Sequence, residues 1–422
     1  MIGGHLPILL VAILLLAAPI CVLIRREQFA WLIATFSIWL SLASACTLMV
    51  QILNTGEVEY YLGGWMPPFG IEYNLDSLNT AIIILILSIT GIIITFGRQS
   101  IKREIEPHRQ HLFYCVFLLT LIGLLGITAT ADLFNVYVFL EVSSLGSYVL
   151  IGLGKKRQAL KASYRYLIQG TIGATFILIG IGFLYAMTGT LNMADLANRI
   201  EPLYDSRPVI VAITIILVGI FIKLALFPLH LWLPGAYTYA PSVVSAFLAA
   251  TSTKVAAYLL IRFIYSVIGY EIAFDHFLLS EILISLSLIA ILVGSIAAIM
   301  QSDVKRILAY SSISQIGYLV VGIGIPSITG LTAGITHMFN HSLTKGAMFL
   351  AVGCVVYRIG NSKLENFCGI GKKMPFTSSA ILIGGLGLIG VPGTAGFISK
   401  WFLVKAALEN GLWPVAVIIL VG

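Results

Sequence analysis

The feature that most constrains this chain is a series of long, continuous apolar runs. Each is long enough to cross the hydrocarbon core of a bilayer as a helix, which takes roughly 20 residues. Because backbone groups in lipid must be hydrogen-bonded within their own segment, and because polar and apolar residues do not alternate, the runs predict helices instead of a barrel. The spans are expected at residues 5–24, 28–52, 78–97, 112–130, 133–153, 163–188, 208–229, 241–265, 278–300, 307–325, 329–357, 375–409 and 412–422.

The composition supports this reading of the apolar runs. Hydrophobic residues make up 59% of the 422 residues and charged residues only 10%, too few polar groups to cover the surface of a soluble protein. The predicted fold class is therefore an all-α polytopic membrane protein with about thirteen visible transmembrane helices. The first run has no basic stretch before it and is expected to be retained. The last run is too short to cross a bilayer, so we expect the sequence to stop inside a helix of a longer protein of about fourteen spans.

The cysteines and the missing motifs argue against a bound cofactor. Five cysteines lie in or beside the apolar runs without any CxxC pairing, which is typical of inert small hydrophobic residues. The chain has no nucleotide-binding loop, catalytic triad or set of cluster-ligating cysteines. We expect neither a cofactor nor a metal site.

The charges of the loops predict an orientation. With the amino terminus outside, the cytoplasmic loops carry seventeen basic residues and the opposite loops two, Arg199 and Arg207, which is the positive-inside asymmetry. The net charge of +7 is therefore explained by topology and not by a nucleic-acid partner. The seventeen are Arg25, Arg26, Arg98, Lys102, Arg103, Arg109, Lys155, Lys156, Arg157, Lys161, Arg165, Lys305, Arg306, Arg358, Lys363, Lys372 and Lys373. The external loops hold the acidic residues Glu57, Glu59, Glu72, Asp76, Glu271 and Asp275.

Several charged residues lie inside the spans and need an explanation. At a helix centre each unpaired charge costs on the order of 2.5–3.5 kcal/mol. Ion pairs that staple helices together are the structural alternative, whereas a hydrated path for protons or cations is the functional one. Five such residues in one chain favour the path: Glu141, Lys223, Lys254, Lys345 and Lys400. Arg262 and Lys405 lie near span ends, where long side chains reach the interface.

The helix around Glu141 carries a stripe of polar groups. Tyr137, Glu141, Ser144 and Tyr148 recur at helical spacing and share one face. A carboxylate lined by hydroxyls is typical of a hydrated interior and not of a lipid-facing surface.

Two spans contain residues that break a helix beside a lysine. Lys223 lies five residues before Pro228, whose ring removes a backbone hydrogen bond and clashes near Leu224. Lys400 follows GVPGTAGFIS, in which Pro392 and two glycines would interrupt the twelfth helix. A lysine beside carbonyls freed at a break is the geometry that discontinuous transporter helices use for ions, and the five-span separation of the two breaks predicts an inverted repeat.

A polar stripe also runs along the eleventh span. It could bind a metal through its HxxxH spacing, but no carboxylate or thiolate accompanies the histidines and a lysine follows them. Two imidazoles that titrate near neutral pH, next to a buried lysine, indicate a proton relay. The stripe consists of His337, Asn340, His341, Thr344 and Lys345.

At these residues the sequence resembles the antiporter-like membrane subunits shared by Mrp sodium/proton antiporters, respiratory complex I and membrane-bound hydrogenases. The resemblance covers nearly the whole chain. It is most specific in GGWMPPFGIEYNLDSL (63–78), IKLALFPLHLWLPGAYTYAPSVVSAFLAATSTKVAAYLLIR (222–262), SDVKRILAYSSISQIGY (302–318) and PGTAGFISKW (392–401).

The resemblance implies a role for each of these residues and a division of the chain. It matches Glu141 to the helix-five glutamate, Lys223 to the broken-helix lysine, Lys254 to the helix-eight relay lysine and Lys400 to the terminal lysine, with the helix-eleven histidine at His337 or His341. It also implies a first part at 1–111 and two inverted five-helix repeats at 112–268 and 269–422.

The segment Leu233–Tyr237, where complex I relatives commonly read Leu-Pro-Asp-Ala-His, is similar to the D-type member of the Mrp subunits. We therefore expect an inner-membrane subunit of a monovalent cation/proton antiporter that assembles with other membrane subunits. In this hypothesis Glu141 and Lys223 form an ion pair, and protons move through Lys254, His337, His341 and Lys345 towards Lys400. The alternatives are a pumping subunit of complex I or a hydrogenase, and a scaffold that transports nothing.

Overall fold

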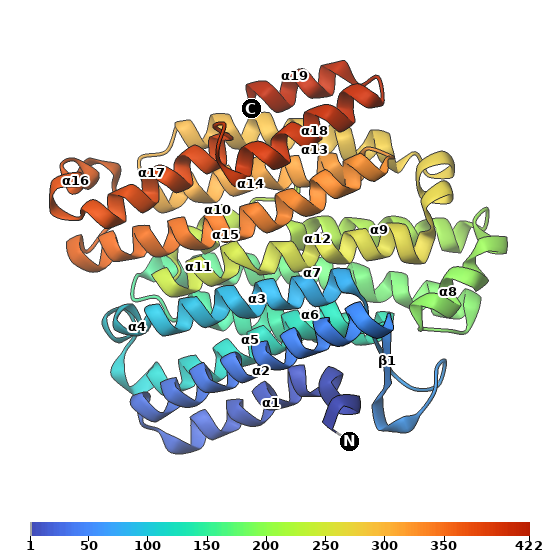
Figure 1. Ribbon diagram of the computed structural model, residues 1–422, viewed down its shortest axis with the longest axis horizontal. Coiled ribbons are helices and arrows are strands. Elements are labelled where there is room, and N and C mark those ends of the chain that lie inside the picture. The colour runs from blue at the N-terminus through green and yellow to red at the C-terminus, as the bar shows by residue number, and fades with distance from the viewer. Residues whose placement is uncertain (1) are drawn as a thin grey trace.

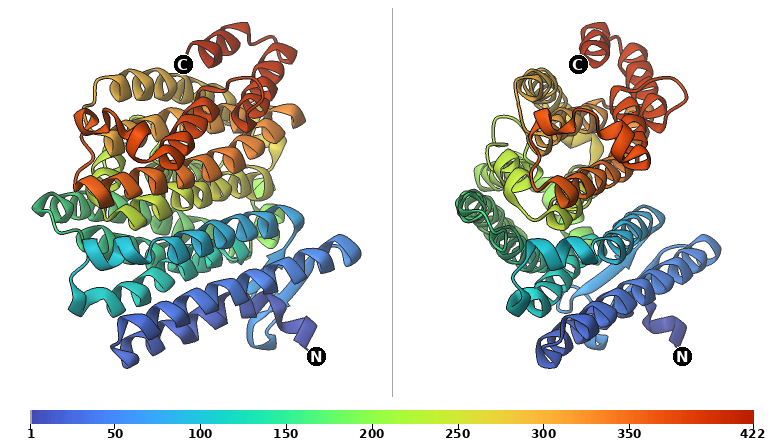
Figure 2. Two further views of the ribbon diagram at one scale, coloured as in Figure 1. Left: turned by 60° about the vertical axis from the view of Figure 1, so that its left-hand side comes forward. Right: turned by 90° about the vertical axis from the view of Figure 1, so that its left-hand side faces the viewer.

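The computed structural model describes residues 2–422 as a bundle of long helices that lie side by side. Their axes follow one common direction, and the chain progresses from α1 at one edge to α19 at the other (Figure 1). The two termini therefore lie at opposite edges of the bundle (Figure 2).

The first half of the chain contains nine helices and one hairpin. They are α1 (Leu6–Ile24), α2 (Glu27–Thr55), β1 (Val58–Tyr61), β2 (Glu72–Leu75), α3 (Ser77–Phe96), α4 (Arg98–Glu104), α5 (Gln110–Ala129), α6 (Leu133–Gly152), α7 (Arg157–Thr188), α8 (Met193–Ile200) and α9 (Arg207–Leu224). The second half contains α10 (Leu233–Tyr239), α11 (Ser242–Ala250), α12 (Ser252–Arg262), α13 (Leu279–Ile299), α14 (Val304–Gly324), α15 (Ile328–Ile359), α16 (Ile370–Lys373), α17 (Pro375–Ile389), α18 (Ala395–Glu409) and α19 (Trp413–Val421).

The predicted class of multi-pass helical membrane protein is confirmed, whereas the number of about thirteen spans stays a prediction. Within residues 2–422, eleven helical stretches are long and apolar enough to cross a membrane. The predicted span 375–409 consists of two helices, α17 and α18, of 15 residues each. At 1.5 Å per residue each extends only about 22 Å, less than a hydrocarbon core of about 30 Å. The segment 412–422 contains the nine-residue α19. The domain boundaries and the inverted repeats stay predictions.

The first predicted break is present at the end of α9. The helix ends at Leu224, and Ala225 takes a left-handed conformation with φ 59°. The N–H of Ala225 donates to the carbonyl of Ile222 and that of Leu226 to the carbonyl of Phe221, at 3.2 and 3.0 Å. This pair of hydrogen bonds is the Schellman arrangement, which satisfies carbonyls left free at a helix end.

The second predicted break separates α17 from α18. Gly390 ends α17 with φ +87°, a conformation that only glycine adopts without strain. The two half-helices then approach closely: a Cβ on Gly396 would lie 1.8 Å from the carbonyl oxygen of Gly387. A glycine at 396 is therefore a steric requirement of this break.

A third interruption, at Thr251 between α11 and α12, is absent from the sequence-based prediction of one span at 241–265. Thr251 has φ −120° and ψ −56°, outside the helical region. The N–H of Lys254 donates to the carbonyl of Thr251 at 3.0 Å, so the helix resumes after one distorted turn. Its cause in the sequence is the run Thr251-Ser252-Thr253, because these short polar side chains compete for backbone groups.

Contacts between loops define the two ends of the bundle. At one end, here called the basic end, Lys155 donates to the carbonyl of Arg103 at 2.7 Å, and the N–H of Val304 donates to the carbonyl of Ser362 at 2.8 Å. In Figure 1 this end carries α4 and α16, and the opposite, acidic end carries β1 and α8. The loops that the positive-inside rule assigned to one side thus meet at one end of the molecule.

The acidic end is closed by the β-hairpin, a local exception to the all-α prediction. Strands β1 and β2 pair antiparallel, with Tyr60 opposite Tyr73. Tyr73 also forms a bridge with Thr130 beyond the end of α5. Val58, Tyr60 and Tyr61 in β1 and Tyr73 in β2 are residue types that favour strands.

Candidate functional site

Lys223 is buried, with 6% of its surface exposed, near the end of α9. Its Nζ donates to the hydroxyl of Ser144 on α6 at 2.7 Å. The predicted ion pair with Glu141 was wrong, because none of the salt bridges among residues 2–422 joins the two side chains. Glu141 lies three residues before Ser144 and is partly exposed, whereas Lys223 and Ser144 both line a small cavity.

The cavity at Lys223, here called the Lys223 chamber, has a volume of about 30 Å³. A water molecule needs about 10–15 Å³ of such space and two to four polar partners, so the chamber has room for one or two waters. Partners are available in the hydroxyls of its lining residues Ser143, Ser144, Ser147, Tyr166 and Ser252.

Lys254 lies next to the interruption between α11 and α12 and is 1% exposed. Its Nζ donates to the carbonyl of Ala249, and Thr253 Oγ1 lies 3.4 Å away. The next carbonyl, of Ala250, accepts from Ser342 of α15 at 2.8 Å. Side chains therefore occupy both carbonyls at the distorted turn, and α15 packs directly against it.

The two histidines of α15 are buried with unused ring nitrogens. His337 and His341 are each 2% exposed, and their rings lie nearly parallel with centroids 6.0 Å apart. His337 Nδ1 is 3.0 Å from the hydroxyl of Ser399 on α18. His337 Nε2 and both nitrogens of His341 have no hydrogen-bond partner among the described residues. Such atoms are available for a proton or a water.

The predicted polar stripe of α15 divides between two faces. Lys345 is fully buried, and its Nζ donates to the carbonyl of Leu308 at 2.8 Å and to Ser311, both on α14. Asn340, in contrast, donates to the carbonyl of Ala395 at the start of α18. The stripe therefore contacts α14 with one edge and α18 with the other.

Lys400 lies at the break between α17 and α18. Its Nζ donates to the carbonyl of Ile389, the last residue of α17, at 3.2 Å. The same ammonium lies 4.2 Å from the ring centroid of Tyr318, a cation–π contact. Lys254 and Lys400 thus each bind a carbonyl at a helix interruption, as predicted for Lys400. Within residues 2–422 Lys223 does not: its Nζ donates to Ser144, and Trp232 donates to the carbonyl of Ile222.

Five of the predicted residues lie on neighbouring elements. α15 carries His337, His341 and Lys345, and it contacts the elements of the other two through the hydrogen bonds of Ser342 with the carbonyl of Ala250, near Lys254, and of His337 with Ser399, next to Lys400. None of the ion pairs among residues 2–422 involves any predicted site residue, which argues against the helix-stapling alternative. The buried ammonium groups donate to hydroxyl and carbonyl oxygens and not to carboxylates.

Sequence reasoning missed most of the hydroxyl groups that complete the site. Each lies on a different helix from the predicted residue that it approaches, which is Lys223 for Ser143, Ser147 and Ser252, Lys345 for Ser311, and His337 for Ser399. A signal was present in the small hydroxyl clusters inside apolar spans, such as ATSTK at 250–254 and SSIS at 311–314.

A second cavity of about 440 Å³ opens at the acidic end, here called the acidic vestibule. Ile127 and Leu259 line both this vestibule and the Lys223 chamber. Its carboxylates are Glu57, Glu59, Glu72 and Asp76, of which Asp76 pairs with Arg262.

Glu72 is the most buried carboxylate of the vestibule, with 7% of its surface exposed. Burial raises its pKa, while a hydrogen bond from Asn192 at 2.7 Å acts in the opposite direction.

Among the described residues, the linings of the vestibule and the chamber share only Ile127 and Leu259. An apolar septum therefore separates the two cavities.

The family described as NADH:quinone oxidoreductase/Mrp antiporter, TM, matches residues 130–422. The chain belongs to the NADH:quinone oxidoreductase/Mrp antiporter family. One relative within this family, the N-type subunit of the NADH-quinone oxidoreductase of Desulforudis audaxviator, is 44% identical over 99% of this chain and 83% of its own length. Another, the D-type subunit of the Na(+)/H(+) antiporter of Alkalihalophilus pseudofirmus, is 32% identical over 94% of this chain and 79% of its own length.

A solved structure agrees with these relatives. A chain of the Mrp complex from Dietzia sp. DQ12-45-1b superposes with a TM-score of 0.90 at 27% identity, covering 100% of this chain and 77% of that one. The NADH:quinone oxidoreductase/Mrp antiporter family thus contains relatives named as antiporter subunits and as oxidoreductase subunits, and both are subunits of larger membrane assemblies.

Proposed function

We propose that this chain translocates protons and monovalent cations as a subunit of a multisubunit Na⁺(K⁺)/H⁺ antiporter, and that it does so without enzymatic chemistry. The observation that carries the proposal is a group of basic side chains inside the spans that have no carboxylate partner among residues 2–422: the buried Lys254, Lys345, His341 and His337, and the partly exposed Lys400. Charges inside a membrane span are costly, and they usually mark a path for ions or protons. The chain would lie in the cell inner membrane with its amino terminus and its acidic end outside.

The proposed path begins in the acidic vestibule, whose carboxylates attract cations and protons. Transient wetting between Ile127 and Leu259 would connect it to the Lys223 chamber. From the chamber, the hydroxyl of Ser252 leads to Thr253, which lies 3.4 Å from the Nζ of Lys254. The charge of Glu141 acts on Lys223 from outside the chamber and would set when the chamber proton is released.

The path continues along α15 and ends at the second break. Among the described residues, neither ring nitrogen of His341 has a hydrogen-bond partner, and His337 has one nitrogen without a partner and one bonded to Ser399. A proton can pass through an imidazole by entering at one nitrogen and leaving from the other. Ser399 precedes Lys400, whose partial exposure supports an exit at the break between α17 and α18.

A second candidate function is a proton-pumping membrane component of a respiratory complex, powered by electron transfer in partner subunits. It is favoured by the 44% identity to a relative named as part of an NADH-quinone oxidoreductase. The sequence Leu233-Pro234-Gly235-Ala236-Tyr237 and the identity to a D-type antiporter component favour the antiporter. The two functions differ in whether cation addition alone moves protons.

The test uses inverted vesicles from antiporter-deficient cells that produce the complete complex from its own gene cluster. With a proton gradient established, added Na⁺ or K⁺ should dissipate it, as followed with a pH-sensitive dye. Lys400→Ala should reduce this exchange about tenfold or more, because it removes the ammonium that binds the carbonyl of Ile389. Partner subunits should still co-purify with the variant.

Lys405→Ala is the matched control. Lys405 lies on the same helix as Lys400, but it is exposed and pairs with Glu409 at 3.6 Å on the surface. The complex that carries Lys405→Ala should exchange cations at the wild-type rate. If no cation dissipates the gradient in vesicles that contain the complete complex, the antiporter proposal is wrong and the pump remains. Normal exchange by Lys400→Ala would instead exclude the relay.

A further inference from the structure

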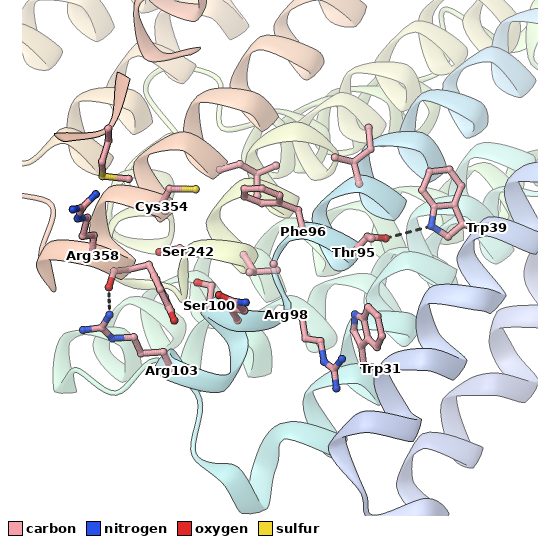
Figure 3. A pocket seen from close by; sticks show the side chains of 18 residues that line it. Trp31, Trp39, Thr95, Phe96, Arg98, Ser100, Arg103, Ser242, Cys354 and Arg358 are labelled. Atoms are coloured by element: carbon pink, nitrogen blue, oxygen red, sulfur yellow. Dashed lines mark hydrogen bonds between the residues drawn. The ribbon is translucent and has the colours of Figure 1, made fainter. Parts of the chain in front are cut away.

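A groove with a volume of about 1060 Å³ lies between α2, α3, α4 and α15, away from the proposed path. Here called the α2–α15 groove, it has Trp31, Trp39 and Phe96 among its apolar lining residues (Figure 3). Leu350 also lines it. None of the seven predicted site residues lines it. The transport path therefore does not explain it.

The groove is open and apolar on the outer surface of the bundle. Trp39 is 42% exposed, and Ile92 and Phe96 on α3 are 52% and 59% exposed. Trp39 lies eight residues beyond Trp31 on α2, which places it about 12 Å deeper along the helix axis. The length and the apolar lining fit an extended hydrocarbon chain that runs parallel to the helices.

One margin of the groove is positively charged, at the basic end of the bundle. Arg98, Arg103 and Arg358 lie along it (Figure 3). Arg98 is neutralised by Glu27 at 3.1 Å. Arg103 and Arg358 donate only to backbone carbonyls, of Tyr357 and Lys373, and no salt bridge among residues 2–422 involves either.

A nearby carboxylate does not neutralise these two arginines. The two oxygens of Glu104 accept from Ser100 at 2.5 Å and from the N–H of Ser242 at 2.8 Å. Guanidinium groups bind phosphate through parallel charge-assisted hydrogen bonds, and each retains further N–H donors beside its one carbonyl bond. The margin is thus suited to an anion that carries phosphate oxygens.

We propose that the α2–α15 groove binds an anionic phospholipid, with its phosphate at Arg103 and Arg358 and one acyl chain along Phe96 towards Trp39. A basic margin at the end of an apolar groove between transmembrane helices matches both parts of such a lipid. An apolar helix of a partner subunit would fill the groove but would leave two guanidinium groups desolvated without a counter-charge. The positive-inside orientation places the headgroup in the cytoplasmic leaflet.

The bound lipid would connect parts of the chain that are distant in sequence. Arg103 belongs to α4 and Arg358 to α15, and the ring of Tyr357 already lies 4.9 Å from the guanidinium of Arg103. A phosphate between the two arginines joins α4 to the helix that carries His337 and His341. The lipid would therefore stabilise the contact of α15 with the first half of the bundle.

The first experiment measures lipid binding to the complete, delipidated complex by native mass spectrometry. Phosphatidylglycerol should bind in preference to phosphatidylcholine. The double substitution Arg103→Gln/Arg358→Gln should weaken phosphatidylglycerol binding about tenfold to thirtyfold, as expected for two basic groups near an anionic headgroup. Arg306→Gln is the control, since Arg306 lies at the basic end and stacks on Tyr310 outside the groove. It should bind as the wild type does.

The second experiment identifies the occupant of the groove directly and does not depend on folding of the double variant. The photoreactive residue p-benzoylphenylalanine is introduced in place of Phe96, and the complex is irradiated in the native membrane. A phospholipid adduct supports the proposal, whereas an adduct to a partner subunit overturns it. Equal binding of both lipids, or wild-type binding by Arg103→Gln/Arg358→Gln, would also overturn it. None of these readouts depends on which transport function the complex has.

Discussion

Glu141 and Ser144 are neighbours on one face of α6, and only Ser144 contacts Lys223. Any effect of the carboxylate on the lysine must therefore act through its charge over a distance and not through a direct bond. At mid-membrane, where the effective dielectric constant is low, such an interaction is strong. The residue-scale hypothesis is that the charge of Glu141, and not its hydrogen bonding, controls Lys223.

Glu141→Gln keeps the size and hydrogen bonding of the side chain but removes the charge. We expect cation/proton exchange to fall about tenfold or more, because a charge interaction of about 1.4 kcal/mol corresponds to a factor of ten. Glu141→Asp keeps the charge and should retain partial activity. Exchange in inverted vesicles, measured across a pH series, checks both. Full activity of Glu141→Gln at an unchanged pH optimum would show that this charge has no part in transport.

At the scale of elements, the sequence predicted two of the three helix interruptions and missed the third. The breaks after Leu224 and at Gly390 are marked by Pro228 and by the glycines of GVPGTAG, whose effects on the backbone are local. The distortion at Thr251 has no such local marker in the sequence, since threonine also occurs in many unbroken helices. It is stabilised by Lys254 and by Ser342, which lies 91 residues away from Thr251 in sequence and can only be found in the fold.

The same limit explains the prediction of the Glu141–Lys223 ion pair. Helical periodicity correctly placed Ser144 on the face of Glu141, but it does not state which of the two groups approaches α9. That choice depends on the rotation and tilt of α6 against α9, which side-chain packing between helices decides.

The septum between α5 and α12 is the element that separates the acidic vestibule from the Lys223 chamber. Leu259→Ala would remove half of this barrier and leave a continuous cavity that water can enter. We expect a proton leak in the absence of added cation, seen as a faster collapse of the gradient in inverted vesicles.

Leu260→Ala is the control for this substitution. Both leucines lie on α12 and are buried, at 4% and 0% exposure, but Leu260 lines neither cavity. Each truncation should cost about 2–5 kcal/mol of stability, so the amount of assembled complex must be compared. An equal leak in both variants would show that the leak arises from lost packing and not from the septum.

At the scale of the whole molecule, the sequence predicted the fold class because the bilayer imposes a simple rule on composition and run length. It also predicted which loops share an end, since charge distribution is set by insertion and not by packing. The structure agrees at the basic end, where Lys155 contacts Arg103 and Val304 contacts Ser362. The seven site residues came from the cost of buried charge and from the resemblance, whereas their hydroxyl partners needed the fold.

The basic and acidic ends of the bundle should face opposite sides of the membrane. Lys156 is exposed at the basic end and Glu57 is exposed at the acidic end, so cysteines at the two positions report opposite sides of the bilayer. In a background without the exposed Cys46 and Cys368, a membrane-impermeant maleimide should label Glu57→Cys in intact cells. It should label Lys156→Cys only after permeabilisation, because the excess of seventeen basic loop residues predicts that this end faces the cytoplasm. Labelling of Lys156→Cys in intact cells would reverse the orientation, and with it the side from which the acidic vestibule receives cations and the leaflet that supplies the proposed lipid.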